Sequence, residues 1–187
     1  MQRVVVGGGT STGKTTFARE LGRRMGVPVI ELDSLFHGPN WTPTPTDVFR
    51  ERILAATSGN AWVIDGNYSA IRDATWGRAD TFIWLDLSAP LVLWRLFKRT
   101  NRRIRSREEL WNGNRESFRN AYLSLDSLYL WVFRSHWTRR RNWPRVLVQP
   151  EYRHLVVHRF RTPGEAARWL RSIDGNTDRT GVRSGAP

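Results

Sequence analysis

The stretch Gly8-Gly9-Thr10-Ser11-Thr12-Gly13-Lys14-Thr15 decides the fold of this chain, because it fits the phosphate-loop pattern G-x-x-x-x-G-K-[ST] without an insertion or deletion. An apolar run precedes it, and the residues that follow place Phe17, Leu21 and Met25 on one helical face. A strand, a glycine loop and a helix in this order are the context that the pattern requires. We therefore expect residues 8–16 to bind a nucleoside triphosphate.

The chemistry of such a loop predicts a role for each part of it. Backbone N–H groups that point into the loop, and the positive end of the following helix, attract phosphate oxygens. Lys14 is predicted to reach the β- and γ-phosphates, and the Thr15 hydroxyl to ligate Mg²⁺. ATP and Mg²⁺ are the expected cofactors. The predicted nucleotide-binding residues of the loop are Gly8, Gly9, Thr10, Ser11, Thr12, Gly13, Lys14, Thr15 and Thr16.

Length and composition favour one compact domain. The chain has 187 residues, of which 40% are hydrophobic and ten are Trp, so it can bury an ample core. It contains no cysteine, which excludes disulfides and thiolate metal sites. No apolar stretch approaches the roughly eighteen residues of a membrane span, and the first predicted strand leaves no room for a signal peptide. We expect a soluble, cytoplasmic protein.

Positive charge is concentrated in the second half of the chain. The formal net charge is +13, and residues 1–90 contain nine basic and nine acidic side chains, so the excess comes from residues 91–187. Nearly all of these cations are arginines, and clustered guanidinium groups indicate an anionic partner. Polyphosphate beneath a closing lid and nucleic acid on the surface both fit this pattern. A solvated basic face is the third interpretation.

Apolar runs alternate with helical patterns, which predicts a parallel α/β sheet. Strands are predicted over residues 3–7, 28–32, 62–65, 81–86 and 154–158. Helices are predicted directly after the glycine loop and over residues 46–57, 91–103, 116–133 and 164–173.

Three stretches lack such a pattern. Residues 33–46 contain Gly38, Pro39, Pro43 and Pro45 and are predicted to be an irregular loop. Arg139-Arg140-Arg141 is predicted to lie in the link to the last strand. Residues 174–187 are polar and are predicted to be a disordered tail. The expected fold class is α/β: a three-layer P-loop nucleoside-triphosphate hydrolase fold with a parallel five-stranded sheet, in one domain over residues 1–173.

Acidic residues follow three of the predicted strands. In parallel sheets ligands bind beyond the carboxyl ends of the strands, where Asp33, Asp65 and Asp86 fall. An aspartate there can hold Mg²⁺ through water or take the proton of an acceptor hydroxyl. We assign the acceptor to Asp33, which opens the long loop, and metal support to Asp65. For Asp86 we favour a helix cap or a turn.

Several motifs together resemble adenylate kinase and its relatives, and most of all the related topology modulation proteins. The resemblance covers roughly residues 1–173. It rests on the glycine loop and on Leu32-Asp33, Gly38-Pro39-Asn40-Trp41, Asp65-Gly66-Asn67-Tyr68 and Leu110-Trp111-Asn112-Gly113-Asn114-Arg115. It implies a nucleotide-kinase-like fold with a mobile lid over about residues 104–116.

The resemblance also implies roles for arginines. Arg99, Arg102 and Arg103, in the helix after the fourth strand, are expected to contact the ATP phosphates or the adenine ring. Arg107 and Arg115 are expected to lie in the lid and to close over the transferring phosphoryl group. Arg161 is expected to border the adenine. The predicted catalytic residues are Lys14, Asp33, Arg99, Arg103 and Arg107; Arg102 and Arg115 complete the arginine set. Convergent guanidinium groups stabilise the charge that spreads over the phosphoryl oxygens in the transition state.

The sequence departs from adenylate kinases on the acceptor side. Adenylate kinases carry an arginine shortly after this aspartate, whereas Ser34-Leu35-Phe36-His37 follows Asp33 here. Asn67-Tyr68 stands where they have a proline after the Asp-Gly pair. AMP is therefore not the expected acceptor. Phe36, His37 and Trp41 are candidates for a pocket that holds a ring or sugar, with ordinary packing as the alternative, and Arg72 for binding an anionic group. The predicted acceptor residues are Asp33, His37, Trp41, Asn67, Arg72 and Arg115.

Two functional hypotheses follow, and a regulatory nucleotide-binding protein is a third. The first is an ATP-dependent kinase of a small molecule or nucleotide. The second is a nucleic-acid-associated NTPase or polynucleotide kinase, because arginines alternate with tryptophans over residues 94–143. Against the second, most of these tryptophans fall in apolar helical patterns and are expected in the core. The sequence leaves the acceptor and the oligomeric state open.

Overall fold

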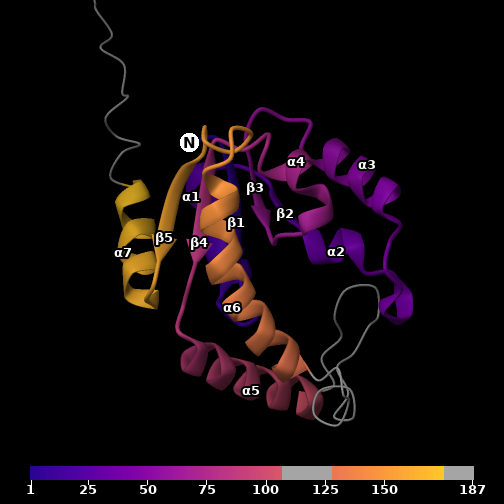
Figure 1. The fold of residues 1–187 in the computed structure, drawn as a ribbon, viewed down its shortest axis with the longest axis vertical. Coiled ribbons are helices and arrows are strands. Elements are labelled where there is room, and N and C mark those ends of the chain that lie inside the picture. The colour runs from indigo at the N-terminus through magenta and orange to yellow at the C-terminus, as the bar shows by residue number, and fades with distance from the viewer. Residues whose placement is uncertain (107–127, 175–187) are drawn as a thin grey trace, which may run out of the picture.

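A computed structural model describes residues 1–106 and 128–174 of the chain. Five parallel strands form one sheet in the order β2-β3-β1-β4-β5, with α6 in front of it and α1 behind it (Figure 1). The α/β prediction with a parallel five-stranded sheet is confirmed. The strands are β1 (Arg3–Gly8), β2 (Val29–Glu31), β3 (Trp62–Asp65), β4 (Thr81–Leu85) and β5 (Val156–Phe160).

Helices cover both faces of the sheet and connect its strands. They are α1 (Lys14–Met25), α2 (Leu32–Phe36), α3 (Thr46–Ala56), α4 (Arg72–Thr75), α5 (Ala89–Ser106), α6 (Leu128–Leu147) and α7 (Pro163–Asp174), with short 3-10 turns η1 (Pro39–Trp41) and η2 (Ser69–Ile71). Side chains of successive residues in a strand point to opposite faces, so Val5 joins one core while Val4 and Val6 join the other. The first core lies under α3, α4 and α6, and the second under α1 and α7.

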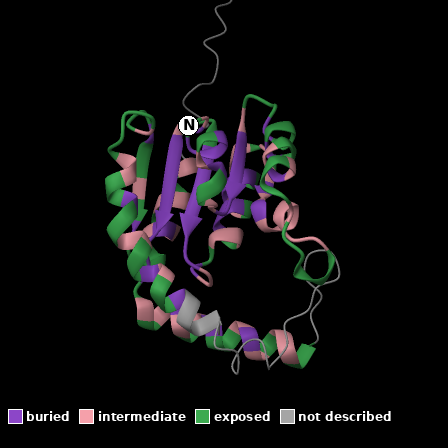
Figure 2. Ribbon diagram, turned by 45° about the vertical axis from the view of Figure 1, so that its right-hand side comes forward, coloured by how far each residue is buried: buried purple, intermediate pink, exposed green. Residues whose placement is uncertain are grey.

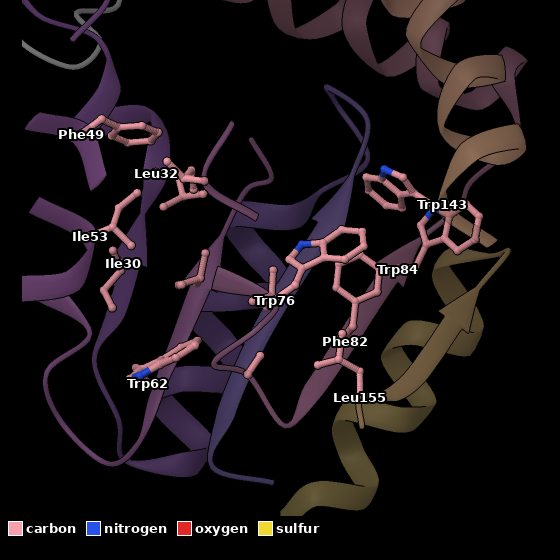
Figure 3. Packing of buried hydrophobic residues seen from close by; sticks show 14 residues of the cluster. Ile30, Leu32, Phe49, Ile53, Trp62, Trp76, Phe82, Trp84, Trp143 and Leu155 are labelled. Carbon is pink, nitrogen blue, oxygen red and sulfur yellow. The ribbon is translucent and has the colours of Figure 1, made fainter. Parts of the chain in front are cut away.

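A cluster of aromatic rings fixes α6 to the sheet. The ring of Trp143 lies 5.2 Å from that of Trp84, 5.3 Å from Phe82 and 5.5 Å from Trp76 (Figure 3). Such ring pairs contribute about 0.5–1.5 kcal/mol each beyond the burial of their area. The prediction that tryptophans of the second half belong to the core holds for Trp143.

Helix α6 is the main correction to the predicted elements. The prediction ended a helix at residue 133 and gave the following arginines to a link, but residues 128–147 are helical. Val132, His136 and Trp143 are buried at helical spacing, so the helix carries an apolar stripe through the arginine cluster. Pro144 lies only three residues before the end of the helix, where it does not stop it. Residues 116–127 of the predicted helix lie outside the described residues.

The last strand is shifted by two residues from its predicted position. Leu155-Val156-Val157 is apolar and suggested a strand over 154–158, but the strand is Val156–Phe160. It pairs with β4 from Val156 opposite Thr81 to Phe160 opposite Leu85. Because β5 is an edge strand, Val156 and Val157 are exposed while Phe160 is buried, so its apolar residues do not mark its bounds.

Smaller corrections concern segments between the strands. The predicted loop 33–46 begins with helix α2, and α5 is longer at both ends than the predicted 91–103. Residues 104–106 of the predicted lid form the last turn of α5, and the rest of the lid lies outside the described residues. Helix α7 ends at Asp174, beyond which the predicted tail also lies outside the described residues. Across the described ranges, no helix is both long and apolar enough to cross a membrane.

Candidate active site

The predicted phosphate loop and two of the strand-end aspartates meet at one edge of the sheet. The buried strands lie side by side with their carboxyl ends at the same edge (Figure 2). Strand β1 has β3 on one side and β4 on the other, so the loop that follows it lies where the strand order reverses. Asp33 follows β2 and Asp65 ends β3, both on the β3 side of that loop.

Hydrogen bonds within the phosphate loop fix its conformation. The Lys14 ammonium and the Thr12 hydroxyl each donate to the Gly9 carbonyl at 2.8 Å. Gly13 has φ 92°, a left-handed conformation that a side chain would strain. Helix α1 then starts without a capping side chain and without an acidic residue in its first turn. Its first N–H groups are therefore available to an anion.

Lys14 lies in an electrostatic environment shared with the rest of the site. Burial lowers the pKa of Lys14, while the carboxylates of Asp65 and Asp33 oppose this shift. Arg139 and Arg99 lower the pKa of Lys14 further. The charged groups of these four residues are thus close enough to Lys14 to act on it electrostatically.

Asp65 and Thr15 fit the requirements of a magnesium site. Burial raises the pKa of Asp65, and the Lys14 charge and a hydrogen bond from Thr15 oppose that shift. Oδ1 of Asp65 is buried and has no hydrogen-bond partner within the described residues. A group of three or more His, Cys, Asp or Glu residues that could hold a metal is absent from residues 1–106 and 128–174. Mg²⁺ needs no such group, because it takes one or two protein ligands besides phosphate oxygens and waters.

Asp33 is held by Tyr68, which the sequence analysis did not assign to the site. The Tyr68 hydroxyl donates a hydrogen bond to Oδ1 of Asp33 at 2.6 Å. Burial, followed by the charge of Asp33, raises the pKa of Tyr68, so this hydroxyl stays protonated and acts as a donor. Gly66, at φ 121°, turns the chain between Asp65 and Tyr68. A side chain at this position would be strained and would press against Leu32.

Two arginines at the phosphate loop were also missed. Nη1 of Arg95, on α5, donates to the Thr12 carbonyl at 3.3 Å. Nη2 of Arg139, on α6, lies so close to Gly9 that a Cβ atom on this glycine would come within 2.7 Å of it. This nitrogen is buried without a hydrogen-bond partner among the described residues, and burial lowers the pKa of Arg139 to about 10. Arg95 stands one helical turn before Arg99, a spacing that could have indicated it.

Asp86 forms an ion-pair cluster rather than a helix cap. Its carboxylate accepts hydrogen bonds from Arg140 Nε at 2.7 Å and from Arg159 Nη2 at 2.6 Å. The Arg159 guanidinium also lies 4.1 Å above the ring of Trp84. Asp86 thus joins β4 to α6 and β5, and it fixes the helix that carries Arg139.

Asp86→Asn is expected to lower the free energy of unfolding by about 2–3 kcal/mol, less than for a fully buried pair because its arginines are partly solvated. Asp86 is 3% exposed, whereas Arg140 and Arg159 are 31% and 34% exposed. Urea unfolding at pH 7 measures the change. Asp73→Asn is the control, since its pair with Arg50 is exposed and should contribute below about 1 kcal/mol. Equal losses in both variants would contradict a structural role for Asp86.

The other predicted site residues have varied surroundings. Asn67 accepts a hydrogen bond from the Gly8 amide at 3.3 Å and so supports the phosphate loop. The rings of His37 and Trp41 lie 5.3 Å apart, and Arg72 lies 4.8 Å above the ring of Trp76. Arg103 is half-buried and Arg161 is exposed, with its backbone N–H bonded to Glu165. Arg107 and Arg115 lie outside the described residues.

Comparisons with known proteins agree with this architecture. No protein-family model matches the sequence, and no curated protein matches it. A shikimate kinase from Acinetobacter baumannii, solved in complex with shikimate, is similar over 98% of this chain and 96% of its own, with a TM-score of 0.54 and 17% identity. For a shikimate kinase from Bacteroides thetaiotaomicron the TM-score is 0.52, with 15% identity over 95% and 98% of the two chains.

An unliganded sugar kinase from a Janibacter species is also similar, over 93% of this chain and 95% of its own. Its TM-score is 0.51 and its identity 18%. Likeness at these identities establishes the fold. The chain has the fold of P-loop kinases, and its place in the topology modulation group stays a prediction.

Proposed function

We propose that this protein is an ATP-dependent phosphotransferase that phosphorylates a hydroxyl group of a small molecule. The observation that carries the proposal is the convergence of Lys14, Asp65 and Asp33. The charges of both aspartates act on the lysine of the phosphate loop. A phosphate-binding loop alone would serve any nucleotide-binding protein, but a carboxylate held beside it by Tyr68 suits proton transfer from an acceptor.

The proposed reaction assigns a task to each of these groups. The loop N–H groups and Lys14 hold the ATP phosphates. Thr15 and Asp65 would hold Mg²⁺, which would neutralise charge on the phosphate oxygens. Asp33 takes the proton of the acceptor hydroxyl as its oxygen bonds to the γ-phosphorus. The bond from that phosphorus to the bridging oxygen breaks, and ADP leaves with the electron pair. Arg139 and Arg95 stabilise the charge on the transferring group.

The arginines predicted from the resemblance remain part of the proposal. Arg99 acts on Lys14 electrostatically and is the one best supported by its surroundings. Arg103, Arg107 and Arg161 keep their proposed roles at the phosphates, in the lid and at the adenine.

Asp33→Asn is expected to lower kcat by about 10²–10⁴-fold, the contribution of a positioned general base. The amide cannot take the proton, but Tyr68 can still donate to it, so the site should keep its shape. The measurement is ATP consumption with Mg²⁺, alone and with a panel of nucleosides, nucleotides, sugars and other alcohols. ATP binding should not change, and Asp47→Asn, at an exposed position of α3, is the control. Full stimulation by an acceptor in the Asp33 variant would remove Asp33 from the mechanism.

A second candidate function is nucleic-acid-associated NTP hydrolysis or polynucleotide phosphorylation. Contrary to the prediction, Trp94 and Trp137 are 56% and 54% exposed, and Lys98 lies 5.2 Å from the Trp94 ring centroid. Exposed rings among cations can stack on bases while the cations contact phosphates. Single-stranded oligonucleotides in the same panel test this candidate. Stimulation by them alone, with a steep fall as salt rises, would favour it over the small-molecule kinase.

A further inference from the structure

We infer that the phosphoryl acceptor is an uncharged alcohol built on a ring, a nucleoside or a cyclic sugar rather than a carboxylate or a phosphate ester. The inference rests on the proposed function and names the substrate class of the same site. It is carried by two independent features of the acceptor side: a wall of aromatic rings next to Asp33, and described arginines of α1, α3 and α4 that already have partners.

The aromatic wall begins beside Asp33 and reaches the surface. The ring of Phe36 lies 4.7 Å from that of Tyr68, which holds Asp33, and 5.0 Å from that of His37. The ring of His37 in turn lies 5.3 Å from that of Trp41, which is 37% exposed. Phe49 closes the wall from the core side, where Figure 3 shows it near Leu32. Ligand pockets lined by rings with a few polar groups suit ring-shaped ligands.

The loop that carries Trp41 is built to hold this ring in place. Asn40 and Trp41 have φ of 55° and 58°, a conformation that is a genuine outlier for a side chain as bulky as Trp. Backbone hydrogen bonds of 2.8 Å, from Gly38 to Thr42 and from Thr44 to Phe36, close the loop on both sides. Strained backbone persists only where its surroundings determine it, and such sites gather at ligand clamps. We therefore assign Trp41 to the ligand rather than to packing.

The arginines of α1, α3 and α4 on this side of the described structure already have partners. Arg50 pairs with Asp73, and Arg72 lies over the ring of Trp76. Arg52 donates to the Leu35 carbonyl at 3.2 Å. Arg19 pairs with Glu31 at 2.6 Å. An acceptor anion would have to displace one of these contacts to find a cation here.

Two further carboxylates lie near Asp33, because Glu31 and Asp65 are paired across β2 and β3. Asp33 and Glu31 both raise the pKa of Asp65, on top of the effect of burial. Arg19 already pairs with Glu31, and the cations around Lys14 are those that we assign to the ATP phosphates. A carboxylate or phosphate on the acceptor would therefore add a negative charge without a partner of its own, and burying an unpaired charge is strongly unfavourable. The residues Ser34-Leu35-Phe36-His37, where adenylate kinases carry an arginine, agree with an acceptor that brings no charge.

Matched pairs of acceptors with one skeleton test the inference directly. We would measure kcat/KM with Mg·ATP for adenosine against AMP, for glucose against glucuronate, and for methyl shikimate against shikimate. The uncharged member of at least one pair is expected to be phosphorylated with a kcat/KM at least tenfold above that of its anionic partner. Formation of the phosphorylated product is followed as well as ATP consumption, so that ATP hydrolysis is not counted.

Trp41→Ala should raise KM for the uncharged acceptor about tenfold, the loss expected for one stacked ring, with little change in kcat or in KM for ATP. Trp94→Ala, which removes a more exposed ring on α5, is the control and should change neither constant for the acceptor. His37→Arg supplies the missing cation beside Trp41. It should lower the preference for the uncharged member of a pair at least tenfold.

Each outcome bears on the inference or on the function beneath it. Preference for the anionic member of every pair that reacts would overturn the inference and leave the kinase proposal intact. An acceptor KM equal in the Trp41 and Trp94 variants would remove Trp41 from the acceptor site and overturn the inference as well. If no compound is phosphorylated and Lys14→Ala leaves ATP consumption unchanged, the proposed function itself fails.

Discussion

Arg139→Ala is expected to lower kcat by about 10³–10⁵-fold, the range found for an arginine that stabilises a transferring phosphoryl group. Nη2 of Arg139 lies over Gly9 of the phosphate loop and has no hydrogen-bond partner within the described residues. A buried guanidinium without an acceptor is unfavourable until an anion arrives. The γ-phosphate supplies that anion, and its charge develops further in the transition state. The measurement is acceptor phosphorylation at saturating ATP.

The same variant should make the nucleotide-free protein more stable, because it removes a buried charge that only Asp86 partly offsets. Loss of activity together with a gain in stability is typical of a functional residue. Arg141→Ala is the matched control, since Arg141 lies on the same helix but is exposed. If the two variants lose activity equally, or if Arg139→Ala lowers stability, Arg139 acts by packing and not on phosphate.

The parts of this site that the sequence predicted depend on local patterns. The glycine loop, its strand and its helix are contiguous, and the spacing of Gly8, Gly13 and Lys14 is sufficient to recognise them. Asp33 and Asp65 could be predicted because each follows an apolar run, and the carboxyl ends of parallel strands meet at one edge. The same pattern placed Asp86 at that edge, but it could not reveal the two arginines that occupy its carboxylate.

The parts that were missed are placed by contacts between distant segments. Arg139 reaches Gly9 because Trp143 packs against Trp76, Phe82 and Trp84 and so fixes α6 over the sheet. Tyr68 reaches Asp33 across 35 residues of sequence. A local sequence pattern cannot predict contacts between residues that are so far apart in the chain. In α6 the run of arginines also obscured the buried stripe, because three adjacent cations are more typical of a link than of a packed helix.

Lys14→Ala is expected to reduce ATP-dependent turnover at least about 10³-fold, to the level of a blank, because it removes a charged donor aimed at the phosphates. Lys14 already donates to the Gly9 carbonyl and so helps to set the shape of the empty loop. The alanine variant therefore loses the phosphate contact and part of the loop's preorganisation. Both the equilibrium binding of ATP and its turnover should be lost in this variant. Lys98→Ala, at the only other lysine of the chain and exposed on α5, should leave both unchanged.

The pH dependence of kcat/KM separates this role from a merely structural one. Burial lowers the pKa of Lys14 in the free protein, so its ammonium loses the proton at a lower pH than an ordinary lysine. Activity that needs the ammonium is present below this lowered pKa and falls as pH rises through it. In Lys14→Arg the guanidinium stays protonated, so any remaining activity should lose that fall. An unchanged alkaline limb in Lys14→Arg would show that Lys14 is not the titrating group. Retention of turnover in Lys14→Ala would move the ATP site away from this loop altogether.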